Sequence, residues 1–189
     1  MKKGVFVVIS GPSGVGKDTI ASSLIERGNG IYSVSMTTRE RRFYEVEGKD
    51  YFFRTKEEFE DNIRNGNMFE YATYNGNYYG TLKSFIFDNI DNGTNVISVI
   101  DIQGATTVEE IYPDAVLIFI MPPSFEELEK RLRDRESDSE DSINRRLEIA
   151  KKEITYRDKY DYVVINDDID RCINEIENII KKEETRVNK

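Results

Sequence analysis

The stretch VFVVISGPSGVGKDT, residues 5–19, decides the fold of this chain. It begins with a hydrophobic run, VFVVIS, that is typical of a strand buried on both faces. Gly11, Gly16 and Lys17 then match the pattern G-x-x-x-x-G-K-[ST], and a helical stretch, KDTIASSLIER, follows directly. A strand, a Gly-rich loop and a helix in this order predict a loop whose backbone N–H groups bind phosphate at the helix N-terminus.

One position of this loop departs from the pattern. Asp18 stands where Ser or Thr would offer a hydroxyl to Mg²⁺. In one interpretation the Asp18 carboxylate coordinates the metal, directly or through water, because Mg²⁺ prefers hard oxygen ligands. In the other, phosphates and water hold the metal, and Asp18 is only favoured by the positive end of the helix. Thr19, one position later, is a further source of a hydroxyl.

Strand and helix patterns alternate along the rest of the chain. The runs VISVI (96–100), AVLIFI (115–120) and YVVIN (162–166) are nearly continuous in hydrophobic residues, as in parallel sheets covered on both faces. Ile residues from Ile169 to Ile180 recur at helical spacing, and the polar tail KKEETRVNK is expected to fray. This alternation predicts a doubly wound α/β fold with ligands at the carboxyl ends of the strands.

Two segments interrupt the alternation. Residues 35–93 are rich in Tyr, Phe, Asn and Gly, and predict a small inserted α+β lobe with two short amphipathic helices. Residues 125–150 predict a helix, a charged loop and a second helix. The loop ESDSEDS, residues 136–142, cannot bury apolar area, so we expect it to be mobile. The core of the single domain then comprises about 1–34, 94–124 and 151–189.

Composition excludes several classes of protein. The formal net charge of −9 disfavours non-specific binding to nucleic acid or to anionic membranes, since both need excess Lys and Arg. One cysteine, Cys172, and no histidine exclude an intramolecular disulfide and a Cys/His zinc site. The run after Lys2 and Lys3 is too short for a signal peptide, and no stretch approaches the roughly 20 apolar residues of a membrane span. We therefore expect a cytoplasmic protein.

A basic cluster follows the predicted first core segment. The stretch SVSMTTRERRFYEVEGKDYFF, residues 33–53, places Arg39, Arg41 and Arg42 close together in an otherwise acidic chain. Arginine forks bind phosphate bidentately, and the Tyr51 hydroxyl can add a donor. Alone, such a run is more often a solvated surface. Beside a phosphate-binding loop it predicts the site of a second phosphate, because phosphoryl transfer needs an acceptor in line with the donor.

The chain resembles the guanylate kinase family across almost its whole length. The resemblance rests on motifs in the family's order and spacing: GPSGVGK, SVSMTTRERR with GKDYFF, FEYATYNGNYYGT, IDIQGA, PPSFEELEKRL, INRRL and VVINDD. It implies a P-loop kinase core with a five-stranded parallel sheet flanked by helices, a lobe for the nucleoside monophosphate and a helical lid. It also implies transfer of phosphate from ATP to GMP, with dGMP usually accepted, and a need for Mg²⁺.

The resemblance implies a set of acceptor-site residues. The guanine would be bound by Ser35, Glu70, Thr81 and Asp101, and the GMP phosphate by Arg39, Arg42, Tyr51 and Tyr79. Residue chemistry agrees: the Glu70 carboxylate can accept from guanine N1–H and N2–H together, a donor pair that adenine lacks, and a buried unpaired acid would reject AMP. Ser35 and Thr81 can donate to guanine O6. Tyr78 is assigned a packing role.

The resemblance implies a donor site as well. ATP would contact Gly11, Pro12, Ser13, Gly14, Val15, Gly16, Lys17, Asp18, Thr19, Arg131 and Asn166, and the residues acting on the transferred group would be Lys17, Arg39, Arg135 and Arg146. Lid arginines can neutralise charge much as an arginine finger does. A phosphate oxygen of GMP is already an anionic nucleophile, so the mechanism needs no histidine base.

The sequence departs from the family at two further positions. Val99 stands two residues before Asp101, where the family usually has an acid, so a metal partner is missing there while Asp18 has appeared elsewhere. Glu136 occupies a lid position at which the family tends to have Gly. The first departure concerns the coordination of the metal, and the second concerns the geometry of the lid.

Three functions compete. The first is an active guanylate kinase that needs no nucleic acid, membrane or obligate protein partner and acts as a monomer or homodimer. The second is a guanylate-kinase-like binding module, which usually lacks the loop lysine, whereas Lys17 is present. The third is a P-loop kinase for another monophosphate, which Ser35, Glu70 and Asp101 together disfavour.

Overall fold

The core of the molecule is a five-stranded parallel sheet. The computed structural model describes residues 2–74, 76–134 and 140–189. Across the sheet the strands run in the order β2 (Ile31–Tyr32), β7 (Val96–Val99), β1 (Phe6–Ser10), β8 (Val116–Met121) and β9 (Tyr162–Ile165). The predicted α/β class, with four of these strands at the hydrophobic runs named above, is confirmed. β2, a strand of two residues, was not predicted.

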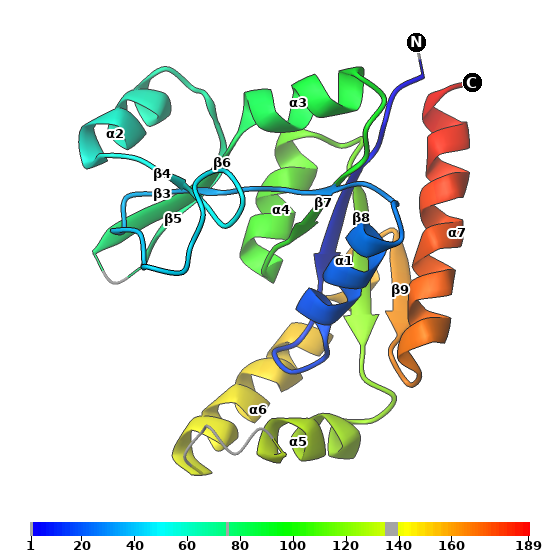
Figure 1. Cartoon of the computed structure of the whole chain (residues 1–189). Helices are drawn as coiled ribbons and strands as arrows, with labels where there is room; N and C mark the ends of the chain where they lie inside the picture. Colours follow the sequence, from blue (N-terminus) through cyan, green and yellow to red (C-terminus); the bar gives the residue numbers. More distant parts are fainter. Residues whose placement is uncertain (1, 75, 135–139) are drawn as a thin grey trace.

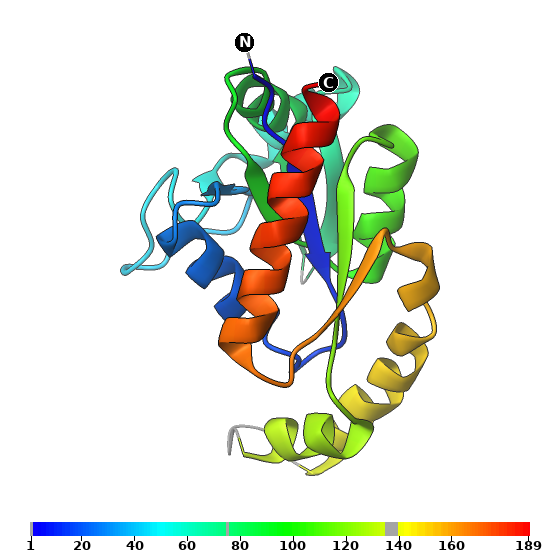
Figure 2. The ribbon, with the colours of Figure 1, turned by 90° about the vertical axis from the view of Figure 1, so that its right-hand side faces the viewer.

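Helices cover both faces of this sheet because side chains alternate along each strand. Val7 and Ile9 of β1 join one core cluster with residues of α1 (Lys17–Glu26) and α7 (Ile169–Val187). Phe6 and Val8 point to the opposite face. There they pack with residues of α3 (Lys83–Asp91) and α4 (Ile102–Ile111). Figures 1 and 2 show α1 and α7 on one side of the strands and α3 and α4 on the other.

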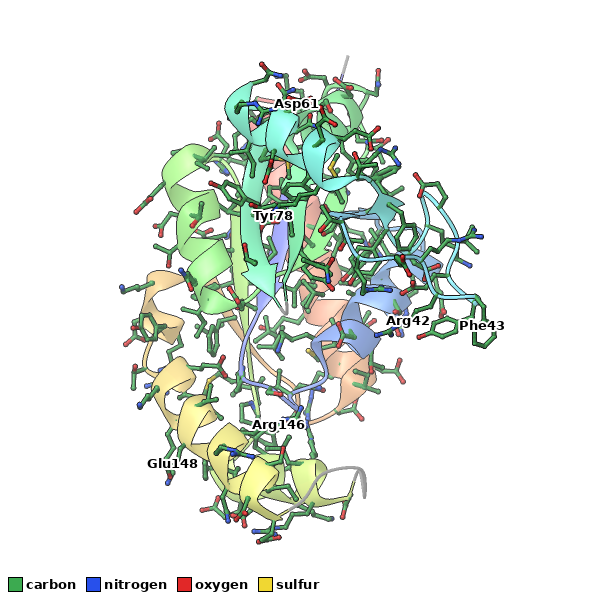
Figure 3. All side chains as sticks on the ribbon, turned by 90° about the vertical axis from the view of Figure 1, so that its left-hand side faces the viewer. Arg42, Phe43, Asp61, Tyr78, Arg146 and Glu148 are labelled. Carbon is green, nitrogen blue, oxygen red and sulfur yellow. The ribbon has the colours of Figure 1, made fainter. Side chains whose placement is uncertain are left out.

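A second, smaller sheet lies within residues 35–93, where an α+β lobe was predicted. Its strands run in the order β4 (Phe52–Phe53), β3 (Met36–Thr37), β6 (Asn77–Leu82) and β5 (Met68–Tyr74). Helix α2 (Lys56–Arg64) begins at a capping box between Thr55 and Glu58, and its buried Phe59 stacks on Tyr78 at 5.1 Å between ring centroids. Tyr78, labelled in Figure 3, therefore has the packing role that was predicted for it.

Two helices, α5 (Phe125–Arg133) and α6 (Glu140–Ile154), occur where a lid was predicted and project from the end of the sheet that carries the Gly-rich loop (Figure 1). A short 3₁₀ turn, Arg157–Lys159, leads from α6 into β9. Arg135 and Glu136 lie outside the described residues, as does most of the loop expected to be mobile. No helix in the described part of the chain has the length and apolar character needed to cross a bilayer.

The expectation that the polar C-terminal tail frays was wrong. Helix α7 continues to Val187. Glu183 is 5% exposed and accepts a hydrogen bond from the Tyr162 hydroxyl at 2.5 Å. Glu184 accepts from the Asn95 side-chain amide at 2.6 Å. These hydrogen bonds, to β9 and to the residue before β7, order the polar end of the helix. The local sequence of this end, which is mostly polar, gives no indication of that order.

Candidate active site

The Gly-rich loop between β1 and α1 has a positive φ, which favours glycine, at Gly11, Gly14 and Gly16, and two of these positions also lie against neighbouring residues of the sheet. Gly11 has a φ of 143°, and a Cβ there would lie 2.4 Å from the Ile120 carbonyl oxygen of β8. Gly16 has a φ of 100° and is the N-cap of α1, and its Cβ would lie 2.9 Å from Asn166 Nδ2. The glycines of the motif thus let the loop turn tightly against the sheet.

Lys17 and Asn166 brace this loop from two sides. Lys17 Nζ donates to the carbonyl oxygens of Gly11 at 2.8 Å and of Pro12 at 3.1 Å, so its ammonium lies over the loop. Asn166, 6% exposed at the end of β9, donates through Nδ2 to the Val15 carbonyl at 2.8 Å. The Asn166 side chain therefore supports the loop, and its proposed contact with adenosine stays a prediction.

Two predicted lid arginines reach the same loop region. Arg146 of α6 donates from Nη2 to Ser13 Oγ at 2.8 Å and from Nε to the same atom at 3.3 Å. Arg131 of α5 donates to the Asn166 carbonyl at 3.0 Å and pairs with Glu127. Figure 3 shows Arg146 lying between α6 and the loop at the end of β1. Helices from the lid segment thus present guanidinium groups next to the predicted phosphate site.

Asp18 and Thr19 are exposed in the first turn of α1. Within residues 2–74, 76–134 and 140–189, no group of three or more Cys, Asp or Glu side chains is arranged to hold a metal ion. Val99 lies beside the core and offers no oxygen. A metal held by Asp18 would therefore take most of its other ligands from phosphate oxygens, the Thr19 hydroxyl or water.

A cavity of about 480 Å³ separates the small sheet from β7 and α4. Predicted base-binding and phosphate-binding residues line it together: Ser35, Glu70, Tyr79, Thr81 and Asp101. The Thr81 hydroxyl donates to Glu70 Oε1 at 2.8 Å, and Ser35 Oγ lies 3.5 Å from Thr81 Oγ1. Adjacent strands produce this row, because Glu70 of β5 faces Thr81 of β6 in the sheet register.

Electrostatics distinguish the two carboxylates in this cavity. Burial raises the pKa of Glu70 above its usual range; the bond from Thr81 opposes the rise, and the neighbouring Asp101 adds to it. Asp101 is exposed, caps α4 and accepts from the Gly104 N–H at 2.7 Å. A partly desolvated carboxylate such as Glu70 gains most from donors that reach it inside the cavity.

The predicted phosphate ligands gather only in part. The Arg39 guanidinium lies 5.6 Å from the Tyr51 ring centroid, and the rings of Tyr51 and Tyr79 are 6.0 Å apart. The Arg42 side chain instead donates to the Tyr44 hydroxyl at 2.9 Å and is exposed, as Figure 3 shows at the edge of the lobe. Three of the four predicted groups are therefore close together, and Arg42 is not with them.

One residue in this cluster was missed by the sequence reasoning. Glu45 is 7% exposed and forms a bidentate ion pair with Arg39. In the sequence it is one of 36 acidic residues, and nothing in its spacing separates it from solvated ones. Only the fold of the loop around residues 39–53 brings its carboxylate to the arginine.

Comparison with known proteins agrees with this geometry. The family model described as guanylate kinase matches residues 3–183. A curated guanylate kinase of Clostridium acetobutylicum is 50% identical over 188 residues, covering 100% of this chain and 90% of that protein. One from a Wolbachia of Brugia malayi is 52% identical over 183 residues, covering 96% and 94%.

Solved structures give the same result. A crystal structure of guanylate kinase from Anaplasma phagocytophilum superposes with a TM-score of 0.73 at 41% identity, covering 97% of this chain and 87% of that one. A shikimate kinase from Bacteroides thetaiotaomicron, at 16% identity and a TM-score of 0.51, shares the fold alone. With a family model over nearly the whole chain and relatives of about half identity over nearly their whole length, the chain belongs to the guanylate kinase family.

Proposed function

We propose that the chain is an active guanylate kinase, which transfers the γ-phosphoryl group of ATP to GMP, and to dGMP, and yields ADP and GDP. The observation that carries this proposal is the row of Glu70, Thr81 and Ser35 in one cavity, in a chain that also has a phosphate-binding loop with its glycines and lysine. The loop lysine, whose loss is typical of binding modules, is present at Lys17 and lies over the loop. Family membership supports the enzyme over the binding module.

In this proposal the cavity selects guanine. Glu70 accepts from N1–H and N2–H of the base, and the Ser35 hydroxyl donates to O6. The Thr81 hydroxyl can donate to O6 only when its one proton turns away from Glu70 Oε1. Asp101 provides a second carboxylate on the opposite wall, at the start of α4. Adenine presents no such donor pair, so AMP would leave the Glu70 carboxylate desolvated and unpaired.

On the acceptor side, Arg39, Tyr51 and Tyr79 would bind the GMP phosphate, and Arg42 would turn inward to join them. A phosphate oxygen of GMP then attacks the γ-phosphorus in line with the leaving ADP oxygen. The protein positions the reactants and neutralises charge, and no side chain has to remove a proton.

On the donor side, the loop N–H groups of Gly11 to Gly16 and the Lys17 ammonium would hold the ATP phosphates, with Arg131, Arg146 and Asn166 around them. Arg135 is placed in this group by the family resemblance alone. Arg146 Nη2 lies 2.8 Å from Ser13 Oγ and is therefore next to the loop. Closure would exclude water, which would otherwise accept the phosphoryl group.

Mg²⁺ fits the residues present only as an ion shared with the nucleotide. Asp18 would hold it, directly or through water, with phosphate oxygens and water completing the coordination. When bound, Mg²⁺ neutralises phosphate charge and polarises the transferred group. An Asp18 carboxylate without the ion would instead repel the ATP phosphates.

We also propose the division of labour that the family implies. Residues of about 35–93 form the GMP-binding lobe, and those of about 125–150 form the lid over the core. The protein would act in the cytoplasm as a monomer or homodimer, without nucleic acid, membrane or an obligate protein partner.

A coupled assay of ADP formation tests the proposed function. ATP and Mg²⁺ are supplied with GMP, dGMP, AMP or UMP, and a Lys17→Ala variant serves as the inactive control. We expect turnover with GMP and dGMP and little with AMP or UMP. GMP binding without turnover at any Mg²⁺ concentration would instead support the binding module, and turnover with AMP or UMP would support a different kinase.

A further inference from the structure

Glu45 holds the arginine that the proposed phosphate site depends on. Its two carboxylate oxygens accept from Arg39 Nη1 at 3.0 Å and from Arg39 Nη2 at 2.6 Å. Glu45 Oε2 also accepts the backbone N–H of Arg42 at 2.8 Å. With 7% of its side chain exposed, Glu45 is a nearly buried carboxylate whose contacts all go to the two arginines of the predicted phosphate site.

The remaining donors of Arg39 are arranged for a second bidentate contact. A guanidinium has five N–H donors, and Arg39 uses two on Glu45 and one on the Glu40 carbonyl at 2.7 Å. The other two, on Nε and Nη2, form the adjacent edge of the same plane. The ion pair with Glu45 raises the pKa of Arg39, and the neighbouring Tyr79 hydroxyl adds to this rise, so both groups lie next to the guanidinium.

Two aromatic rings lie next to this guanidinium. The Arg39 Cζ atom lies 5.6 Å from the Tyr51 ring centroid and 5.9 Å from that of Phe53. Glu45 binds one edge of the Arg39 guanidinium, and the two rings pack next to it. These contacts restrict the orientations that the Arg39 side chain can take. An arginine that is ordered before it binds loses less conformational entropy when the ligand arrives.

We propose that Glu45 is a positioning residue of the phosphate site: by holding one edge of Arg39 it presents the other edge, Nε and Nη2, to the phosphate of GMP. This inference rests on the proposed function. Glu45 stays in place when GMP binds, because the Arg42 N–H bonds it independently of the Arg39 side chain, and the phosphate needs only the second edge.

The same loop contains a matched control. Glu47 likewise accepts from an arginine, Arg54 Nη1 at 2.6 Å, and from a backbone N–H, that of Phe53 at 2.9 Å. Its side chain is 46% exposed, and Arg54 is not among the predicted phosphate ligands. Substituting Glu47 therefore perturbs the loop by the same kinds of contact without touching Arg39.

The test measures equilibrium binding of GMP and of guanosine, which lacks the phosphate, to wild type, Glu45→Gln and Glu47→Gln, by calorimetry or by NMR titration. Glutamine offers one acceptor oxygen, and its amide would face an Arg39 N–H, so the bidentate pair is lost. We expect Glu45→Gln to weaken GMP binding about 10-fold or more while guanosine binding changes less than about twofold. Glu47→Gln should change neither by more than about twofold.

Two further variants show whether Glu45 acts through Arg39. In an Arg39→Lys background, Glu45→Gln should add little to the loss of GMP binding, because a lysine has no second guanidinium edge for Glu45 to orient. Glu45→Asp keeps the charge and both oxygens, so it should lose less GMP affinity than Glu45→Gln. If Glu45→Gln fails to fold, Glu45→Asp carries the same comparison of GMP with guanosine.

Distinct results would overturn the inference. Tighter GMP binding by Glu45→Gln would mean that the carboxylate competes with the phosphate, and equal weakening of GMP and guanosine would mean a merely structural role. Additive effects with Arg39→Lys would also contradict it. If wild type itself does not bind GMP more tightly than guanosine, the phosphate site fails together with the proposed function, a result different from any of these.

Discussion

The Glu70→Gln substitution tests the proposed guanine site most directly. The Thr81 hydroxyl donates to Glu70 Oε1 at 2.8 Å, so a glutamine keeps that bond only by placing its carbonyl oxygen at the same position. Its NH₂ group then takes the place of Oε2. There it meets a guanine N–H, and two donors face each other where a carboxylate accepted a hydrogen bond.

The size of the loss follows from this geometry. One hydrogen bond to a charged group contributes about 1.5–3 kcal/mol, which corresponds to about 10- to 150-fold in kcat/KM for GMP. The guanine donor left unpaired in the cavity adds to this loss. AMP should not suffer, because a glutamine can donate as well as accept. We therefore expect the ratio of kcat/KM for GMP over AMP to fall by at least about 10-fold.

Stability should change in the opposite direction. Burial raises the pKa of Glu70, so between its ordinary and its raised pKa the folded protein binds more protons than the unfolded chain. The free energy of unfolding therefore falls as pH rises through that window, and above it the buried carboxylate of Glu70 destabilises the fold. A neutral glutamine removes this cost, and the melting temperature at pH 7.5 should stay equal or rise.

Initial rates with GMP and with AMP, together with thermal melts, measure both effects. Glu57→Gln is the control, because Glu57 is an exposed acid of α2 outside the cavity. An unchanged GMP over AMP ratio in Glu70→Gln would refute the reasoning. A lowered melting temperature with equal loss of both substrates would show that Glu70 supports the fold instead.

Three further predictions concern other parts of the site. Guanosine binding should weaken as pH falls from 8 to 5, since Glu70 must be ionised to accept two donors and its pKa is raised; calorimetry with Glu70→Gln should show no such dependence. Asp18→Ser should shift the Mg²⁺ concentration that gives maximal turnover, and an unchanged titration would leave Asp18 without a metal role. Arg146→Ala should lower kcat by about 10³-fold, in the range of arginine-finger losses, whereas its exposed neighbour Arg145→Ala should leave steady-state rates near wild type.

Sequence alone was sufficient for the local features of the core. The hydrophobic runs predicted β1, β7, β8 and β9. Strands buried on both faces, such as β1 and β8, are apolar at nearly every position, whereas Val163 and Ile165 of β9 are exposed. The Gly-rich loop was identified from its glycines and lysine, the residue types that a tight phosphate-binding turn at a helix N-terminus requires. Glu70, Thr81 and Ser35 were named through a family resemblance, and the structure brings them into one row.

Other features follow from contacts between residues far apart in the chain, which no local pattern encodes. The two-residue β2 exists because β7 pairs with it, and the polar end of α7 is ordered because Tyr162 and Asn95 bond its acids. The Asn166 side-chain amide likewise supports the loop through the Val15 carbonyl, 151 residues away in the chain, and its contact with adenosine stays a prediction.

The acceptor site shows the same limit most clearly. The sequence determined which side chains can bind guanine and phosphate, because those abilities belong to the residue types themselves. Only the tertiary structure decided that Glu45 is nearly buried against Arg39 while Glu47, two residues away, is half exposed against Arg54. Burial and hydrogen-bond geometry depend on how the loop folds back on β3 and β4, so two residues of the same type have different physical roles.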